Sequence, residues 1–250
     1  MYELKKSLGQ HFLTDENICR RIVGVLDEES VHHLLEVGPG GGALTKYILK
    51  KKGINFKAIE IDTEKVNYLQ NTYPELKSKI INQDILEAEK PFEKNFTVIG
   101  NFPYNISSQI LFKMIEWKEN IDCVIGMFQK EVAQRVAAKK GNKTYGVTSV
   151  LVQAYFKVEY LFEVNENCFT PPPKVKSAVI KLTPLEIPVN MKDERSFRNL
   201  VKAGFNQRRK TLRNATKAYF DPVELSDDIF NMRAEQLSVE EFGMLSFKMK

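Results

Sequence analysis

Apolar and polar residues follow one another in blocks that predict alternating strands and helices as far as about residue 128. Apolar runs of strand length recur at residues 33–37, 56–61, 79–82, 96–100 and 122–128. A first helix is expected over Asp15–Asp27, with Thr14 or Asp15 as its N-cap, and another over Ala43–Lys52. Alternating strands and helices are typical of a parallel, doubly wound sheet, so we expect an α/β fold.

The pattern changes after residue 128 and indicates a second, smaller domain. A basic loop at Lys139–Lys143 precedes a helix that begins near Val147, and residues 157–164 and 175–182 look like a closing β-hairpin or antiparallel pair. Pro184 and Pro188 mark a linker, and the sequence beyond about residue 185 is predicted to be helical and is more basic. We therefore predict one domain over residues 1–184 and an all-helical domain over residues 185–250.

The first strand ends in a glycine-rich loop, Gly38-Pro39-Gly40-Gly41-Gly42, preceded by Glu36. Glycines allow a backbone to approach a ligand closely. The loop lacks the Gly-Lys-Ser/Thr ending of an ATPase phosphate loop, and Ala43 stands where a nicotinamide fold would be expected to have its third glycine. The pattern is commoner in S-adenosylmethionine sites, and a nicotinamide oxidoreductase is kept as an alternative.

Acidic residues follow the next two strands. Glu60 lies 22 residues after Gly38, close to the ~20-residue offset at which a carboxylate meets ribose hydroxyls in dinucleotide folds. Asp62 is the rival acid, because on one strand both side chains would point the same way. Asp84 ends the third run and is placed to accept a hydrogen bond from an adenine amine.

The most informative feature is the turn Asn101-Phe102-Pro103-Tyr104, which follows the strand at residues 96–100. The Asn101 side chain and the Phe102 carbonyl are two acceptors that suit an exocyclic amine on a planar ring, and Tyr104 offers a flat face for stacking. Pro103 supplies no competing N–H. The plain alternative is a strand-ending turn, since Asn-x-Pro is ordinary turn chemistry. The nearby cofactor pattern favours the catalytic interpretation.

Composition narrows the class of protein. The 250 residues are 43% hydrophobic and 28% charged, as expected for a globular chain. No apolar stretch approaches the ~20 residues needed to cross a bilayer, and the N-terminus has no signal-peptide core, so we expect a cytoplasmic protein without a membrane contact. The three cysteines and three histidines lack disulfide or metal-ligand spacing, so we expect no metal.

The positive charge is concentrated near the C-terminus. Residues 195–220 contain eight basic residues and no acid, within a chain of net charge +5. Arg209, Arg213 and Lys217 recur at four-residue spacing and on one helix would form a cationic stripe. A solvated helical face is the alternative, but such faces normally mix signs. The stripe favours a polyanionic partner.

These features together give the chain a resemblance that spans nearly its whole length. It resembles the ribosomal RNA adenine N6,N6-dimethyltransferases of the small-subunit (KsgA) type. The shared segments are Lys6–Leu13, the glycine loop, Glu60, Asp84, Asn101–Tyr104, Phe169–Ser177 and Phe205–Arg213. Phe102 and His11 depart from the family's commoner residues, which are Leu or Ile and Asn respectively.

The resemblance implies a Rossmann-like catalytic domain that uses S-adenosylmethionine and a helical C-terminal domain that docks on ribosomal RNA. The substrate would be two adjacent adenines near the 3′ end of 16S rRNA in a 30S precursor, and we expect a monomer. Catalysis would rest on the turn Asn101, Phe102, Pro103 and Tyr104. The expected cofactor contacts are His11, Leu13, Gly38, Gly40, Glu60, Asp84, Ile85 and Asn101, and the expected RNA contacts are Tyr104, Phe169, Arg208, Arg209, Arg213 and Lys217.

Two related functions compete with this reading. A large-subunit (23S) rRNA adenine methyltransferase of macrolide-resistance type shares the cofactor loop and the Asn-x-Pro-Tyr turn. The segment Phe205–Arg213 favours the small-subunit type. A non-catalytic nucleic-acid-binding or transcription factor of the same fold is the other alternative, and the intact Asn101 turn and acids argue against it.

Overall fold

The computed structural model describes residues 11–250, which form two compact units. One comprises residues 11–133 together with residues 159–184, and the other comprises residues 134–158 and 185–250. The second unit thus contains more than the predicted segment 185–250. The reason is that helix α6 (Val147–Gln153) packs on helices α7 (Glu194–Asn206) and α9 (Val239–Phe247).

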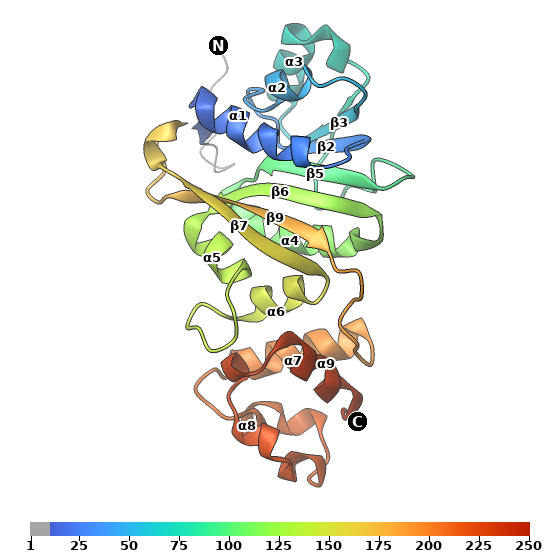
Figure 1. The fold of residues 1–250 in the computed structure, drawn as a ribbon, viewed down its shortest axis with the longest axis vertical. Coiled ribbons are helices and arrows are strands. Elements are labelled where there is room, and N and C mark those ends of the chain that lie inside the picture. The colour runs from blue at the N-terminus through green and yellow to red at the C-terminus, as the bar shows by residue number, and fades with distance from the viewer. Residues whose placement is uncertain (1–10) are drawn as a thin grey trace. The chain divides into compact units, whose positions relative to one another are not determined.

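A seven-stranded sheet is the framework of the first unit (Figure 1). Its order is β4-β3-β2-β5-β6-β9-β7, and the first five strands run parallel. The strand bounds are β2 (His33–Val37), β3 (Asn55–Glu60), β4 (Ile80–Asn82), β5 (Phe96–Asn101), β6 (Ile121–Gln129), β7 (Phe156–Val164) and β9 (Ser177–Pro184). Strand β9 is antiparallel to β6 and lies between β6 and β7. The predicted α/β class and doubly wound sheet are confirmed.

The strand order reverses between β2 and β5, which are neighbours in the sheet although β3 and β4 lie between them in sequence. From β2 the chain builds outward through β3 to β4, and then returns to begin β5 on the other side. In open α/β sheets ligands bind outside the carboxyl ends of the strands at such a switch point. The glycine loop follows β2 and Asn101 ends β5, so the fold brings both predicted motifs to this place.

The helices of the first unit follow their strands. They are α1 (Glu16–Gly24), α2 (Thr45–Ile48), α3 (Thr63–Thr72) and α4 (Ser107–Glu116), and α5 (Lys130–Val136) runs on into the second unit. Helix α1 begins where predicted, because the Asp15 side chain accepts hydrogen bonds from the N–H groups of Asn17 and Ile18. The 3₁₀ turn η2 (Val25–Glu28) prolongs it. Helix α2 is shorter than the predicted Ala43–Lys52, with turns on either side.

Alternate residues of the strands face opposite layers of helices. Leu34, Ile99 and Ile125 pack in one apolar cluster with Ile22 of α1. Leu35, Val98 and Val124 point to the other face. Helix α4 contacts β6 and lies behind it in Figure 1. The sheet is therefore buried on both faces, as its near-continuous apolar strands require.

A separate two-stranded pairing closes the carboxyl edge of the sheet. Strand β1 (Phe12–Leu13) pairs antiparallel with β8 (Phe169–Thr170), so that Leu13 lies opposite Phe169. The short turns of this unit are η3 (Pro74–Leu76), η4 (Tyr104–Ile106), η5 (Lys118–Asn120) and η6 (Glu166–Cys168).

The second unit is helical, as predicted for the C-terminal segment. Besides α6, α7 and α9 it contains α8 (Leu212–Thr216) and the short turns η7 (Lys217–Tyr219), η8 (Glu224–Ser226), η9 (Asp228–Asn231) and η10 (Ala234–Gln236). Asp193 caps α7 by accepting from Ser196 N–H, and Ser238 and Glu241 form a capping box at α9. Phe197, Leu200 and Phe242 are fully buried.

The prediction that one helix carries Arg209, Arg213 and Lys217 is wrong. Helix α7 ends at Asn206, Arg209 lies in the following turn, Arg213 lies on α8, and Lys217 begins η7. The chain turns here because the N–H of Leu212 donates to the Met232 carbonyl, a long-range contact that helical spacing cannot reveal. All three basic side chains are nevertheless exposed.

Candidate active site

A cavity of about 260 Å³ lies at the switch point, at the carboxyl ends of the parallel strands. It brings together segments from across the first unit. Its lining includes His11, Leu13, Gly38, Gly40, Glu60, Asp84, Ile85, Asn101, Phe102, Pro103 and Tyr104. Every cofactor and catalytic residue predicted from the sequence is therefore on one cavity. The remaining residues of the predicted segment Lys6–Leu13, up to Gln10, lie outside the described residues.

The glycine loop is held in place by Glu60. One carboxylate oxygen of Glu60 accepts the Gly40 N–H at 3.0 Å, and the other accepts the Asp62 N–H at 3.0 Å. Gly40 has a φ of 55°, and a Cβ there would lie 3.4 Å from the Phe12 ring, so a larger residue would be strained. Each Glu60 oxygen keeps a second lone pair for a ligand.

Glu60 and its rival Asp62 have different roles. Strand β3 ends at Glu60, and Asp62 instead caps α3 by accepting the Glu64 N–H at 3.1 Å. Glu60 lines the cavity and Asp62 does not. Burial raises the pKa of Glu60, while the two backbone N–H bonds act in the opposite direction. Of the two acids, only Glu60 is thus placed to contact a ligand in the cavity.

Glu36 is a cavity residue whose chemistry the sequence did not reveal. It is 1% exposed and accepts a hydrogen bond from the Thr45 hydroxyl at 2.7 Å. Burial raises the pKa of Glu36 to about 8, and the neighbouring Glu60 adds to the rise. In the sequence, only its position just before the glycine loop could have marked Glu36 as a cavity residue.

Asp84 and Ile85 lie after the end of β4. The Asp84 carboxylate accepts the Leu86 N–H at 2.9 Å, which fixes the turn that carries it to the cavity. Ile85 is 5% exposed and lines the same wall. The pair therefore offers one polar and one apolar contact to a flat ligand.

The Asn101 turn is rigidly positioned. The Asn101 amide NH₂ donates to the His11 carbonyl at 3.3 Å, so its Oδ1 is left as the acceptor. The Phe102 N–H donates to the Met127 carbonyl at 3.1 Å. The Phe102 ring is buried beside two glycines, and a Cβ would lie 2.6 Å from it at Gly100 and 2.4 Å at Gly126. These glycines make room for a phenylalanine under the turn, which sequence reasoning missed.

Tyr104 has a ring partner on one side. The His11 ring stacks on it with centroids 5.6 Å apart and planes inclined by 30°. The Tyr104 hydroxyl hydrogen-bonds to the Ser177 hydroxyl, and His11 Nδ1 lies 2.9 Å from the Pro171 carbonyl oxygen. Burial raises the pKa of Tyr104, so the phenol stays protonated at neutral pH.

Phe169, one of the expected RNA contacts, lies away from the cavity. It is 2% exposed and packs in the core cluster with Leu13 and Cys19. It does not line the cavity. Its strand pairing with β1 accounts for this burial, so in this conformation the residue packs the core and presents no face to a base.

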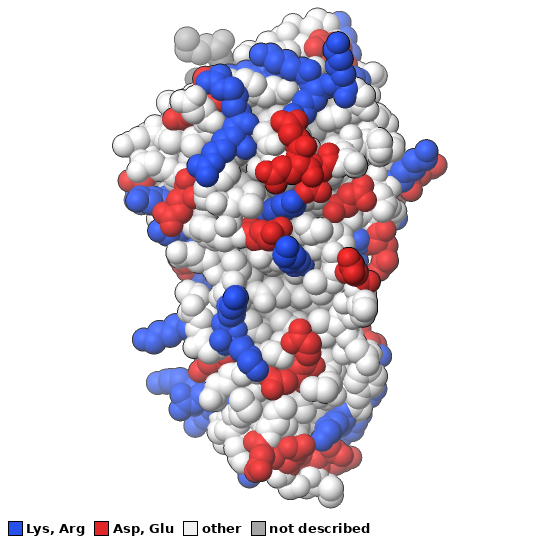
Figure 2. All heavy atoms as spheres, viewed as in Figure 1, with Lys and Arg blue, Asp and Glu red and all other residues white. Residues whose placement is uncertain are grey.

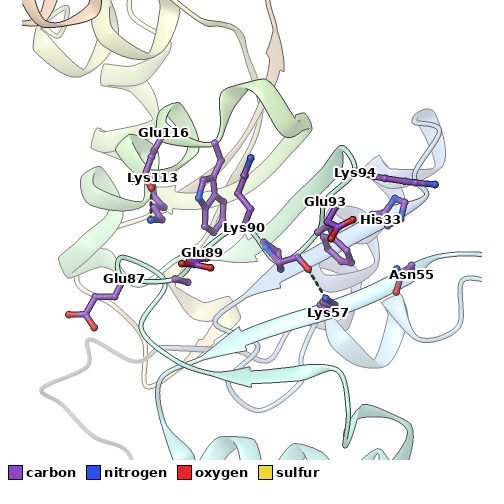
Figure 3. A pocket seen from close by; sticks show the side chains of 14 residues that line it. His33, Asn55, Lys57, Glu87, Glu89, Lys90, Glu93, Lys94, Lys113 and Glu116 are labelled. Carbon is purple, nitrogen blue, oxygen red and sulfur yellow. Dashed lines mark hydrogen bonds and ion pairs between the residues drawn. The ribbon is translucent and has the colours of Figure 1, made fainter.

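A larger groove of about 1140 Å³ lies at the opposite edge of the sheet (Figure 3). His33 and Asn55 begin β2 and β3, so the groove is at the amino ends of the strands. Three of its lysines are engaged within the chain: Lys57 donates to the Pro91 carbonyl at 2.6 Å, Lys90 to Asn120 at 2.6 Å and Lys113 to Glu116 at 2.8 Å. The smaller cavity carries the convergent polar groups, so we assign the chemistry there.

Other features of the described residues bear on the class of protein. None of the helices within residues 11–250 is long and apolar enough to span a membrane. In the same range, no group of three or more His, Cys, Asp or Glu is placed to hold a metal ion. Cys19 and Cys123 are buried free thiols and Cys168 is half-buried.

Comparison with known proteins identifies the family. Residues 1–246 match the family model described as ribosomal RNA adenine dimethylase. The chain is 52% identical to the ribosomal RNA small subunit methyltransferase A of Cytophaga hutchinsonii, with 98% of each chain covered. It is 52% identical to the protein of the same name from Flavobacterium johnsoniae, covering 98% of this chain and 95% of that one.

Solved structures show the same fold. A dimethyladenosine transferase from Plasmodium falciparum has a TM-score of 0.78 at 25% identity, covering 94% of this chain and 95% of that one. The 23S rRNA methyltransferase ErmE has a TM-score of 0.73 at 21% identity, covering 95% and 99%, which bears on the fold alone. Together with the convergence of the motifs on one cavity, the match over nearly the whole length shows that this chain belongs to the ribosomal RNA adenine dimethylase family.

Proposed function

We propose that the protein transfers methyl groups from S-adenosylmethionine to the N6 amines of two adjacent adenines near the 3′ end of 16S rRNA. The family and the small-subunit names of its relatives support this function over 23S methylation. The observation that carries it is the Asn101 carboxamide, whose NH₂ is bound to the His11 carbonyl and whose Oδ1 is left to accept from an amine.

The cavity fits the cofactor by the chemistry of its donors and acceptors. Glu60 would accept the ribose hydroxyls, Asp84 would accept the adenine amine, and Gly38 and Gly40 allow the backbone to come close. Leu13 and Ile85 supply apolar walls. When bound, S-adenosylmethionine supplies an electrophilic methyl group. The relatives are named as methyltransferases, in keeping with the use of a methyl donor.

The protein's own contribution to the reaction is to orient the target amine. An adenine N6 amine is a poor nucleophile because its lone pair is delocalised into the ring. Acceptance of its two N–H groups by Asn101 Oδ1 and the Phe102 carbonyl would localise that lone pair. The aminium cation first formed by methyl transfer is a strong acid that loses its proton to water and leaves the neutral methylated amine, so an Asn is sufficient where many enzymes need a carboxylate base.

Tyr104 would hold the unstacked base. A base must leave its stack before its amine can be reached, at a cost of a few kcal/mol. Stacking on an aromatic ring returns about 1–3 kcal/mol. His11 covers one face of Tyr104, so we assign the base to the other.

The basic side chains of the second unit would bind the RNA backbone. Arg209, Arg213 and Lys217 are exposed, and Arg208 is partly engaged by Glu235 at 3.7 Å. Figure 2 shows Lys and Arg gathered along the left edge of the region that contains α7 and α8 in Figure 1. We propose that the protein acts as a cytoplasmic monomer on a 30S precursor and contributes to ribosome biogenesis.

Replacing Asn101 by Ala tests the proposal. We expect methyl transfer to undermethylated 30S particles to fall by about 10²–10³, because one catalytic electrostatic contact of this kind has that effect. Cofactor affinity should change little. Asn71→Ala, on the exposed side of α3, is the matched control and should keep wild-type activity. Activity of Asn101→Ala within a few-fold of wild type would contradict the assignment.

A further inference from the structure

Ser177 occupies a defined place next to the catalytic turn. It is the first residue of β9 and lies opposite Gln129 at the carboxyl end of β6. On the other side of β6, Met127 lies opposite Asn101. The sheet register therefore brings Ser177 to the same edge as the Asn101 turn, with only β6 between them, although the two are far apart in sequence.

The Ser177 side chain is fully buried and makes one hydrogen bond to a cavity residue. Its exposed fraction is 0%, and its Oγ bonds to the hydroxyl of Tyr104. An apolar residue at position 177 would fill the space equally well, because a buried hydroxyl needs a hydrogen-bond partner to offset its lost hydration. The partner it finds is the far end of the ring that faces the substrate.

The segment from Pro171 to Ser177 contacts both rings of the stacked pair. At its beginning the Pro171 carbonyl oxygen lies 2.9 Å from His11 Nδ1, and at its end Ser177 bonds to Tyr104. The two rings stack with centroids 5.6 Å apart. The ring of Tyr104 is thus fixed at one face by His11 and at its hydroxyl by Ser177, which leaves little freedom about either side-chain torsion.

We propose that Ser177 is a positioning residue that holds the Tyr104 ring in the orientation required to stack on the flipped target base. The inference rests on the proposed function for the role of Tyr104. An aromatic ring that is already held in the stacking orientation binds a base more tightly, because no side-chain entropy is lost in orienting the ring when the base binds.

The test is a double-mutant cycle on Ser177→Ala and Tyr104→Phe, measured as methyl transfer to undermethylated 30S particles. Each single variant removes one hydroxyl and keeps the ring. We expect each to lower kcat by about fivefold, the usual effect of one net hydrogen bond. The double variant should be no slower than either single variant, because both remove the same contact. S-adenosylmethionine affinity should stay at the wild-type value.

Ser246→Ala is the matched control. Ser246 is also 0% exposed, and its hydroxyl bonds to the Gly243 carbonyl on α9 in the second unit. It should lose stability without lowering kcat. Losses that multiply in the Ser177 and Tyr104 double variant, or wild-type kcat in Tyr104→Phe beside a slow Ser177→Ala, would overturn the positioning role.

A second readout does not depend on catalysis. In protein labelled with ¹³Cζ-tyrosine, the Tyr104 resonance is identified by its absence from Tyr104→Phe. Ser177→Ala should shift that resonance at neutral pH and Ser246→Ala should not, whereas an unmoved resonance in Ser177→Ala would overturn the inference. If wild-type protein methylated no rRNA, the proposed function would fail while this measurement still decided whether Ser177 holds Tyr104.

Discussion

Glu60→Ala and Asp62→Ala should differ in cofactor affinity although their stabilities should be similar. Both carboxylates lie near the end of β3 and both accept backbone N–H groups, but only Glu60 lines the cavity. We expect Glu60→Ala to weaken S-adenosylmethionine binding at least about tenfold, and Asp62→Ala to leave that affinity near wild type.

The magnitudes follow from the hydrogen bonds that each acid makes. A hydrogen bond to a charged group contributes about 1.5–3 kcal/mol, and about 1.4 kcal/mol is a tenfold change in affinity. Loss of even one ribose contact at Glu60 therefore reaches tenfold, and loss of both gives at least about a hundredfold. Asp62→Ala removes the cap of α3, which costs about 1 kcal/mol of stability.

Stability should not distinguish the two variants, whatever their cofactor affinities. Glu60→Ala loses two backbone contacts but also removes a carboxylate whose pKa is raised by burial, and these effects offset each other. We expect its unfolding free energy to lie within about 1 kcal/mol of wild type.

Calorimetry gives the affinities and urea unfolding gives the stabilities. Glu60→Gln is an informative third variant. It keeps one acceptor oxygen, but its NH₂ group would face one of the two backbone N–H donors. Its affinity for S-adenosylmethionine should therefore fall between those of wild type and Glu60→Ala. Loss of affinity in Asp62→Ala with none in Glu60→Ala would refute the assignment.

Three further outcomes are expected. Gly126→Ala should lower the unfolding free energy by about 1–3 kcal/mol, because its Cβ would lie 2.4 Å from the Phe102 ring, whereas Gly24→Ala, with nothing within 4 Å, should not. The pKa of Glu36 is raised to about 8, so between about pH 4.5 and 8 the folded protein keeps a proton that the unfolded chain releases. The wild-type unfolding free energy should therefore fall as pH rises through this range, by at most about 5 kcal/mol. In urea unfolding across the same range, Glu36→Gln should not show this fall. Replacing three exposed basic residues by Gln should reduce the log–log salt slope of binding to the 30S precursor by somewhat under one unit per phosphate contact, with cofactor affinity unchanged; an unaltered slope would mean an ordinary solvated face. These residues are Arg209, Arg213 and Lys217.

Sequence predicted the strands and the positions at their carboxyl ends well, because both depend on local pattern. The buried parallel strands are near-continuous apolar runs, and the residues just after them are the glycines, acids and Asn101 that stand out in composition. Once the alternation indicates a doubly wound sheet, the switch-point rule brings these residues together without further information.

Long-range contacts set the limit of what the sequence could predict. Phe169 is buried because β8 pairs with β1, which is far from it in sequence. The turn at Arg209 depends on the hydrogen bond from the Leu212 N–H to the Met232 carbonyl. Neither has a local signal. Asp62 is different, since Asp followed by Glu64 at the start of a helical pattern is a recognisable cap. Ser177 and His11 reach Tyr104 only through the tertiary fold.

The burial of Phe102 between glycines has a consequence for what position 126 can accept. The ring fills space that a side chain at position 126 would otherwise occupy, and the Phe102 carbonyl is the proposed second acceptor for the target amine. A Cβ at position 126 would also lie 2.5 Å from the Phe128 ring, so a smaller residue at position 102 relieves only one of two close contacts. Gly126→Ala combined with Phe102→Leu should therefore regain only part of the stability that the glycine change alone loses. The identity of residue 126 is thus set by two aromatic rings, one of which belongs to the Asn101 turn itself.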